Sequence, residues 1–271
     1  MAKIVYERDK CAEHTNRYRE IAETILDEEQ AVLSAIQNDG TDAAFKRLSL
    51  ADLMLNLASN FIVIDGVSQA MYKQRNEDAL NDARKALYRS IIYLEEIVSN
   101  YLDSPYSDYE DKVKVIENVT PAERYLLVRK MGLAINLLVN AYGDNTKWRW
   151  TFVELEGRYT TVAKNIINLK DIVTNSSFDS PHYEPTVRHL TLVKKLFTQA
   201  ADRYRERYEL STNSLEDFKM GINFLSALRR LNIVTGDQNE AATIKRKLDI
   251  WTVKLATDID KQKKLEKLEK E

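Results

Sequence analysis

The chain carries few histidines and cysteines, the residue types that most often bind zinc in proteins. Its three histidines are His14, His182 and His189, and the last two stand seven positions apart. A metal site needs three or four converging ligands, which on helices usually include a pair three or four positions apart. No Glu-x-x-His or His-x-x-x-His pattern occurs in the sequence. The sequence therefore predicts no metal site, and we expect the histidines to face solvent or to line joints between helices.

Paired acidic residues are the remaining candidates for catalysis. They occur at Glu28-Glu29, at Glu95-Glu96, and at Asp108 with Glu110 and Asp111. Acid–base catalysis needs two carboxyl groups in one pocket with separated pKa values, whereas such pairs on charged helices are usually solvated and linked to Lys or Arg one turn away. The glycines form no phosphate-binding loop, and Cys11 has only His14 as a neighbouring base. We therefore expect a protein that is not an enzyme and needs no cofactor.

Tryptophan, tyrosine and arginine residues are the candidates for a binding surface. These types are enriched at protein interfaces because each joins a large apolar body to a polar end. Two tryptophans stand two apart in a predicted helix and would point about 200° apart around it, so one of them would meet a second layer, a neighbouring repeat or a partner. The segment 101–109 holds three tyrosines at a predicted break, where it would form a binding edge or plug the gap between helix ends. The predicted interface residues are Trp148, Trp150, Arg149, Tyr101 and Tyr106.

Long helices must position these side chains, because the chain is poor in turn-forming residues. It has seven glycines and four prolines in 271 residues, far below the roughly 7% and 5% of average usage, which argues against sheets and tight hairpins. Thr120-Pro121 with Glu123 is a strong helix start. The predicted helices span 4–37, 42–73, 76–101, 106–117, 121–142, 146–175, 183–211, 215–235 and 238–265. The predicted fold is all-α, with long antiparallel helices in an elongated bundle or in stacked helical hairpins.

A sequence pattern occurs twice, 75 residues apart. RSIIYLEEIVSN covers 89–100 and KNIINLKDIVTN covers 164–175, with six of twelve positions identical. Each copy is followed by an Asp-Ser-Pro break, at 103–105 and at 179–181. The alternative is that two helices rich in leucine and isoleucine align by composition alone. Repetition favours three units: 1–118, 119–211 and a C-terminal pair of helices with a charged tail at 212–271.

The charge balance and the termini limit the partners and compartments. The 40 basic and 42 acidic residues give a formal net charge of −2, which offers no basic surface for nucleic acid. The charged N-terminus is unlike a signal peptide, and one cysteine allows no intrachain disulfide, so we expect the cytoplasm. A chain whose leader had been removed would look the same, which leaves the periplasm and secretion as alternatives. The apolar stretch 48–67 contains Asp52, Asn56, Asn60 and Asp65, so a buried helix is expected rather than a membrane span.

These observations favour a non-catalytic scaffold, adaptor or structural subunit of a larger assembly, acting through contacts with other proteins. One alternative is a filament or coat subunit that associates with itself. The other is a small-molecule-binding or enzymatic bundle. In that case the polar residues inside apolar helices would converge on one cavity; they are Asp52, Asn56, Asn60, Asn136, Asn140 and Asn223.

Overall fold

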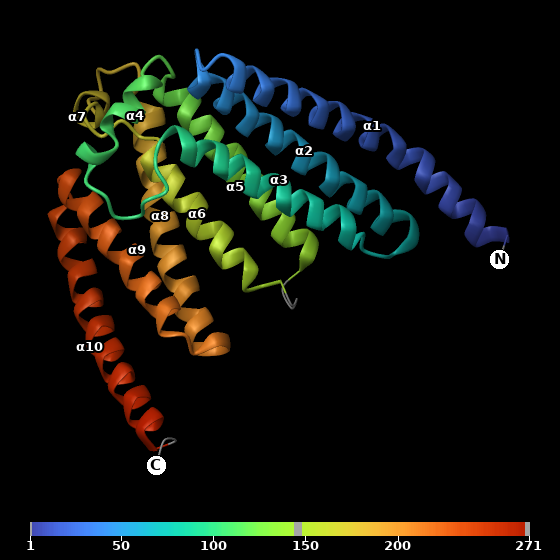
Figure 1. Cartoon of the computed structure of the whole chain (residues 1–271). Coiled ribbons are helices and arrows are strands. Elements are labelled where there is room, and N and C mark those ends of the chain that lie inside the picture. Colours follow the sequence, from blue (N-terminus) through green and yellow to red (C-terminus); the bar gives the residue numbers. More distant parts are fainter. Residues whose placement is uncertain (1, 144–147, 269–271) are drawn as a thin grey trace. The chain divides into compact units, whose positions relative to one another are not determined.

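The structure is a computed structural model that describes residues 2–143 and 148–268. Within these ranges every regular element is a helix, so the predicted all-α class is confirmed. The helices are α1 (Ala2–Asn38), α2 (Ala43–Tyr72), α3 (Glu77–Ile97), η1 (Tyr106–Asp108), α4 (Glu110–Val115), α5 (Pro121–Tyr142), α6 (Thr151–Asn165), α7 (Ile172–Asn175), α8 (Tyr183–Arg207), η2 (Tyr208–Thr212), α9 (Leu215–Val234) and α10 (Gln238–Leu268) (Figure 1).

The chain folds into two compact units that are not consecutive in sequence. Unit 1 comprises Met1–Asn100 and Glu110–Phe152, and unit 2 comprises Tyr101–Tyr109 and Val153–Glu271. The chain therefore passes from unit 1 into unit 2 for the short segment 101–109 and returns to unit 1 at Glu110. The three consecutive units expected from the sequence stay a prediction about repeats, and these compact units follow a different division.

Unit 1 is built around α2. This helix contacts α1, α3 and α5, and Figure 1 shows it between α1 and α3. Leu50, Met54 and Leu57 of α2 and Leu87 of α3 are almost completely buried. α2 is also long and apolar enough to cross a membrane by length and composition. The core helix of a protein in water passes the same test, so this is weak evidence for a span.

Unit 2 is built around α9, which packs against α8 on one side and α10 on the other (Figure 1). Its core contains two pairs of stacked rings. The ring centroids of Tyr204 and Phe224 lie 5.4 Å apart, and those of Tyr208 and Phe218 lie 5.0 Å apart. A Cβ added to Gly157 would lie 2.9 Å from Tyr204. Only a residue without a side chain therefore lets α6 approach this ring so closely.

The predicted helix 146–175 is not continuous in the structure, and residues 146 and 147 lie outside the described residues. The described chain begins this region with a turn at residues 148–150, and the helix starts at Thr151. It then ends at Asn165, and the separate short helix α7 begins at Ile172. The second copy of the repeated pattern is thus a helix end, a turn and a short helix, whereas the first copy is helical as far as Ile97.

Asn168 stabilises the turn that follows α6, at a position where the first copy has a different residue. Tyr93 in the first copy aligns with Asn168 in the second. The Asn168 side chain accepts a hydrogen bond from the backbone N–H of Lys170 (3.1 Å) and donates one to the Asp171 carboxylate (2.5 Å). Such local bonds to an asparagine compete with the helical ladder and favour a turn. Both Asp-Ser-Pro segments lie outside α-helices, as expected.

Candidate protein-binding groove

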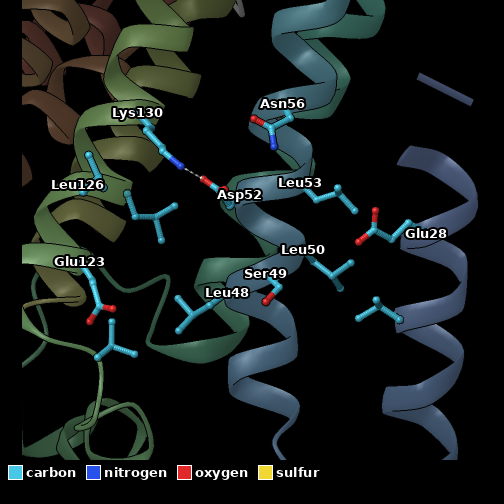
Figure 2. A pocket seen from close by; sticks show the side chains of 13 residues that line it. Glu28, Leu48, Ser49, Leu50, Asp52, Leu53, Asn56, Glu123, Leu126 and Lys130 are labelled. Carbon is cyan, nitrogen blue, oxygen red and sulfur yellow. Dashed lines mark hydrogen bonds and ion pairs between the residues drawn. The ribbon is translucent and has the colours of Figure 1, made fainter. Parts of the chain in front are cut away.

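An open groove of about 410 Å³ lies on unit 1. In Figure 2 α2 forms its floor, while α1 and α5 stand on either side. α1 contributes Glu28 and Val32. The remaining lining residues come from α2, from the first turns of α5, and from Val119, which directly precedes the N-cap of α5. They are Leu48, Ser49, Leu50, Asp52, Leu53, Asn56, Val119, Glu123, Leu126, Leu127 and Lys130.

The groove is part of a longer apolar surface on α5. Leu126 is 52% exposed, and farther along the helix Leu133 is 61% and Leu137 is 43% exposed. Positions 126, 133 and 137 share one face of a helix. The opposite face of α5 is buried and holds Met131, Ile135 and Leu138. α5 therefore has a buried apolar face in the core of unit 1 and a solvent-exposed face on which three leucines alternate with polar residues.

Charged side chains surround the apolar floor. Lys130 Nζ lies 2.7 Å from the Asp52 carboxylate, so these two charges compensate each other across the α2–α5 contact (Figure 2). Glu28 on α1 and Glu123 on α5 place one carboxylate on each wall. The groove thus carries three acidic groups and one basic group, with an excess of negative charge.

The start of α5 is fixed by the capping box that the sequence predicts. The Glu123 carboxylate accepts hydrogen bonds from the Thr120 hydroxyl (2.7 Å) and the Thr120 backbone N–H (2.8 Å), and the Glu123 N–H donates to the Thr120 hydroxyl (3.3 Å). The Thr120 hydroxyl bond, with the backbone bond beside it, lowers the pKa of Glu123. Glu123 therefore stays ionised at neutral pH and keeps its wall of the groove negative.

Buried polar contacts hold the helices around the groove in place. Glu29, directly beside Glu28, is completely buried; it accepts a hydrogen bond from the Tyr93 hydroxyl and forms an ion pair with Arg89. The Ser90 hydroxyl donates to the Ala51 carbonyl of α2 (2.8 Å). A buried carboxylate is tolerated only when it is paired, so these contacts tie α1 and α2 to α3. The α1 and α2 sides of the groove are thereby fixed relative to each other.

The predicted tryptophan pair lies in the turn before α6, not on a helix. The Thr151 N–H donates to the Trp148 carbonyl (2.9 Å), which closes this turn. Trp148 packs against the Tyr142 ring at 6.1 Å and under the Arg84 guanidinium at 4.8 Å. Arg149 and Trp150 contact each other, at 4.8 Å, and all three residues 148–150 are half-buried. The argument from a 200° helical separation is wrong, and an interface role for these residues stays a prediction.

The predicted tyrosines lie in unit 2, whereas the tryptophans lie in unit 1. Tyr101 is 69% exposed, and its carbonyl accepts a hydrogen bond from Asn165 (3.1 Å). Tyr106 is half-buried; its hydroxyl donates to Asn168 (2.7 Å), and its ring packs edge-on against Tyr109 at 5.3 Å. Tyr106 therefore packs at the joint between segment 101–109 and the turn after α6, and Tyr101 is the more exposed of the two. Whether either residue belongs to an interface stays a prediction.

The polar residues proposed for a buried cavity do not converge. Asp52 and Asn56 line the groove, but Asn136, Asn140 and Asn223 are exposed on their helices. His189 is buried and its Nε2 lies 2.9 Å from the Ala163 carbonyl. No group of three or more His, Cys, Asp or Glu side chains in the described parts of the chain is placed to hold a metal ion.

Sequence reasoning did not identify the groove, although one signal was present. The buried stripe of α5 accounts for Met131, Ile135, Leu138 and Tyr142, and the leucines at 126, 133 and 137 do not all fit on it. A second apolar stripe on one helix indicates a second packing surface. The α1 and α2 residues that complete the groove are brought together only by tertiary packing.

The comparisons with known proteins identify a family. A search of curated proteins and a search of solved structures each gave no match. The model of the TP0443 family matches residues 7–259, which is most of the chain and includes every residue that lines the groove. The family's description states no activity, substrate or partner. The chain therefore belongs to the TP0443 family.

Proposed function

We propose that the protein is a non-catalytic helical scaffold or adaptor, a structural subunit that binds another protein of a larger assembly. The groove of unit 1 supports this proposal, together with the exposed leucines that extend it along α5. Leaving apolar surface in water costs about 25 cal/mol per Å², and contiguous exposed apolar surface marks interaction sites. A partner that covers Leu126, Leu133 and Leu137 would remove this cost.

The occupant that fits the groove is an amphipathic helix of the partner protein. Helices dock into grooves through apolar residues spaced three, four or seven apart, which is the spacing of the exposed leucines on α5. With about 410 Å³ of space, the groove admits only a few large apolar side chains. Its excess acidic groups, Glu28 and Glu123, favour a partner helix with Lys or Arg beside the apolar residues, because complementary charge selects partners and speeds encounter.

The first experiment combines affinity capture with a cross-linker that joins carboxylates directly to lysines. The tagged protein is captured from its native cells after carbodiimide treatment, and cross-linked peptides are identified by mass spectrometry. We expect Glu28 or Glu123 to be joined to a lysine of one abundant partner, within a peptide whose apolar residues repeat at helical spacing. Cross-links only to a second copy of this chain would replace the adaptor by a self-associating subunit.

Matched variants test whether the groove is responsible. Leu126→Glu places a charge on the apolar wall and should lower partner recovery at least tenfold. Val253→Glu is the control, because Val253 is 67% exposed on α10 in unit 2 and should leave recovery unchanged. Equal recovery with both variants would exclude the groove as the binding site. A groove that binds small molecules instead would show ligand-dependent stabilisation of the purified protein and no selective loss of a protein partner.

A further inference from the structure

A buried lysine lies at the end of α6, in unit 2, and is not one of the residues that line the groove. Lys164 is only 6% exposed, and its Nζ lies 4.9 Å from the centre of the Tyr109 ring. Burial lowers the pKa of Lys164 to about 8; Asp103 opposes this change, and Arg230 adds to it. Lys164 is therefore an amine whose neutral form is accessible near neutral pH.

Asp103, the carboxylate that acts electrostatically on Lys164, already forms an ion pair with an arginine. Asp103 is held by Arg230 through two contacts, 2.9 Å from Nε and 3.3 Å from Nη2. Among the described residues, none forms an ion pair or a hydrogen bond with Lys164 Nζ. A lysine that served only to balance charge in the core would be expected to pair with a carboxylate. Here Asp103 pairs with Arg230 instead, so the Lys164 amine forms no ion pair with any described carboxylate.

The aromatic residue that faces the amine also has an unused polar group. Tyr109 is 3% exposed, and its buried hydroxyl has no hydrogen-bond partner in the described chain. Buried hydroxyl groups nearly always have a partner. The site therefore contains a nucleophilic nitrogen and a hydrogen-bond donor that a small polar molecule could use.

The cover of this site is a short segment held by a few polar contacts. Segment 101–109 contains only the single turn η1. It is attached to the end of α6 and to the following turn by the Asn165–Tyr101 and Tyr106–Asn168 hydrogen bonds, and to α9 by Arg230. Irregular segments with few buried apolar contacts open locally more easily than core helices do. Local opening of residues 101–108, with Tyr109 still packed on Lys164, would give a small molecule access to the amine.

We propose that Lys164 is a covalent binding site for a small aldehyde, which it holds as an imine. The neutral nitrogen adds its lone pair to the carbonyl carbon while the C=O π pair moves to oxygen. Transfer of the ammonium proton to that oxygen gives a carbinolamine. Loss of water then forms the C=N bond, and addition of water reverses the reaction. No oxidant, reductant or metal takes part, and the site is independent of the groove on unit 1.

The test is reductive trapping on the intact protein. Acetaldehyde and sodium cyanoborohydride are added briefly at pH 7, and ethylation of every lysine is quantified by peptide mass spectrometry. An amine with a pKa near 8 has about 300 times more neutral form at this pH than one with a pKa of 10.5. Allowing for slower access, we expect Lys164 to be ethylated at least tenfold faster than exposed Lys170. Equal or slower ethylation of Lys164 overturns the proposal.

Two variants separate reactivity from mere accessibility. Lys164→Met should abolish labelling of that peptide and leave the other lysines unchanged. Arg230→Gln removes a neighbouring positive charge and frees Asp103 to pair with Lys164; both effects stabilise the ammonium, so ethylation of Lys164 should fall at least threefold. Arg230 is half-exposed, and its variant is checked for an unchanged circular dichroism spectrum. Unchanged ethylation in Arg230→Gln would show that these charges do not control the amine, and the proposal would fail.

Discussion

At the scale of single residues, close helix packing in unit 2 depends on glycine. A Cβ at position 157 would meet the ring of Tyr204 at 2.9 Å and that of Phe224 at 3.1 Å. Both rings are buried and stacked on each other, so neither can move aside freely. Overpacked cores lose about 1–3 kcal/mol.

We therefore predict that Gly157→Ala lowers the free energy of unfolding by about 1–3 kcal/mol. Gly66→Ala is the matched control: Gly66 lies within α2 with nothing within 4 Å of an added Cβ. There alanine should stabilise the helix by about 0.5–1 kcal/mol. Urea denaturation of the two variants measures both changes, and a loss of stability in Gly66→Ala would contradict the packing argument.

The buried amine of Lys164 should appear in the pH dependence of stability. Its pKa is about 8 in the folded protein, against 10.5 for an ordinary lysine, so the unfolded chain binds more protons between these values. The free energy of unfolding therefore rises as the pH increases from about 8 to 10.5. Below pH 8 the buried amine is charged, and the folded protein is destabilised by the full cost of burying it.

Replacing Lys164 by methionine keeps the chain length similar and removes this cost. We predict that Lys164→Met stabilises the protein at pH 7 by an amount of the order of 1–3 kcal/mol. The gain should shrink as the pH is raised to 10.5. Urea denaturation of both proteins at pH 7 and pH 10 gives the difference; a gain that is the same at both values would contradict a lowered pKa.

At the scale of the elements, helix ends were more predictable than helix continuity. Thr120, Pro121 and Glu123 form the predicted capping box and start α5 at the expected residue. The capping box depends on residues adjacent in sequence, so it can be recognised there. The turn after Asn165 is stabilised instead by Asn168, whose side-chain amide also holds Tyr106 from a distant segment. A repeat alignment records this position only as one of six mismatches among twelve positions.

The cap of α5 can be tested against a similar cap that forms no bond. We predict that Thr120→Ala destabilises unit 1 by about 1 kcal/mol, because the N–H of Glu123 loses its acceptor. Ser214 occupies the corresponding position before α9 but makes no capping bond through its side chain. Ser214→Ala should therefore change stability little, as followed by thermal unfolding. Similar losses in both variants would show that the Thr120 hydroxyl bond is not the cause.

At the scale of the whole molecule, the sequence predicted the class of fold but not its division. Glycine and proline scarcity and apolar periodicity are properties of local sequence, and they predicted helices whose ends mostly agree with the structure. Which helices pack together depends on contacts between distant residues, such as Arg89 with Glu29. The groove has the same origin, since its walls come from α1 and α5. The predicted interface residues likewise fall in both units, because membership of a unit is set by packing and not by position in the sequence.

The interleaving of the two units affects how the chain folds during synthesis. Segment 101–109 leaves the ribosome before α6, the turn after α6, and α9, which supply its partners Asn165, Asn168 and Arg230 respectively. At roughly 5–20 residues per second, several seconds pass before the residues of α6 emerge, and Arg230 follows later still. Tyr101, Tyr106 and Tyr109 lack these partners and are exposed to solvent or to chaperones during that time. Unit 1 can assemble once residue 152 has emerged, whereas unit 2 must wait until α10, which ends at Leu268, has been made.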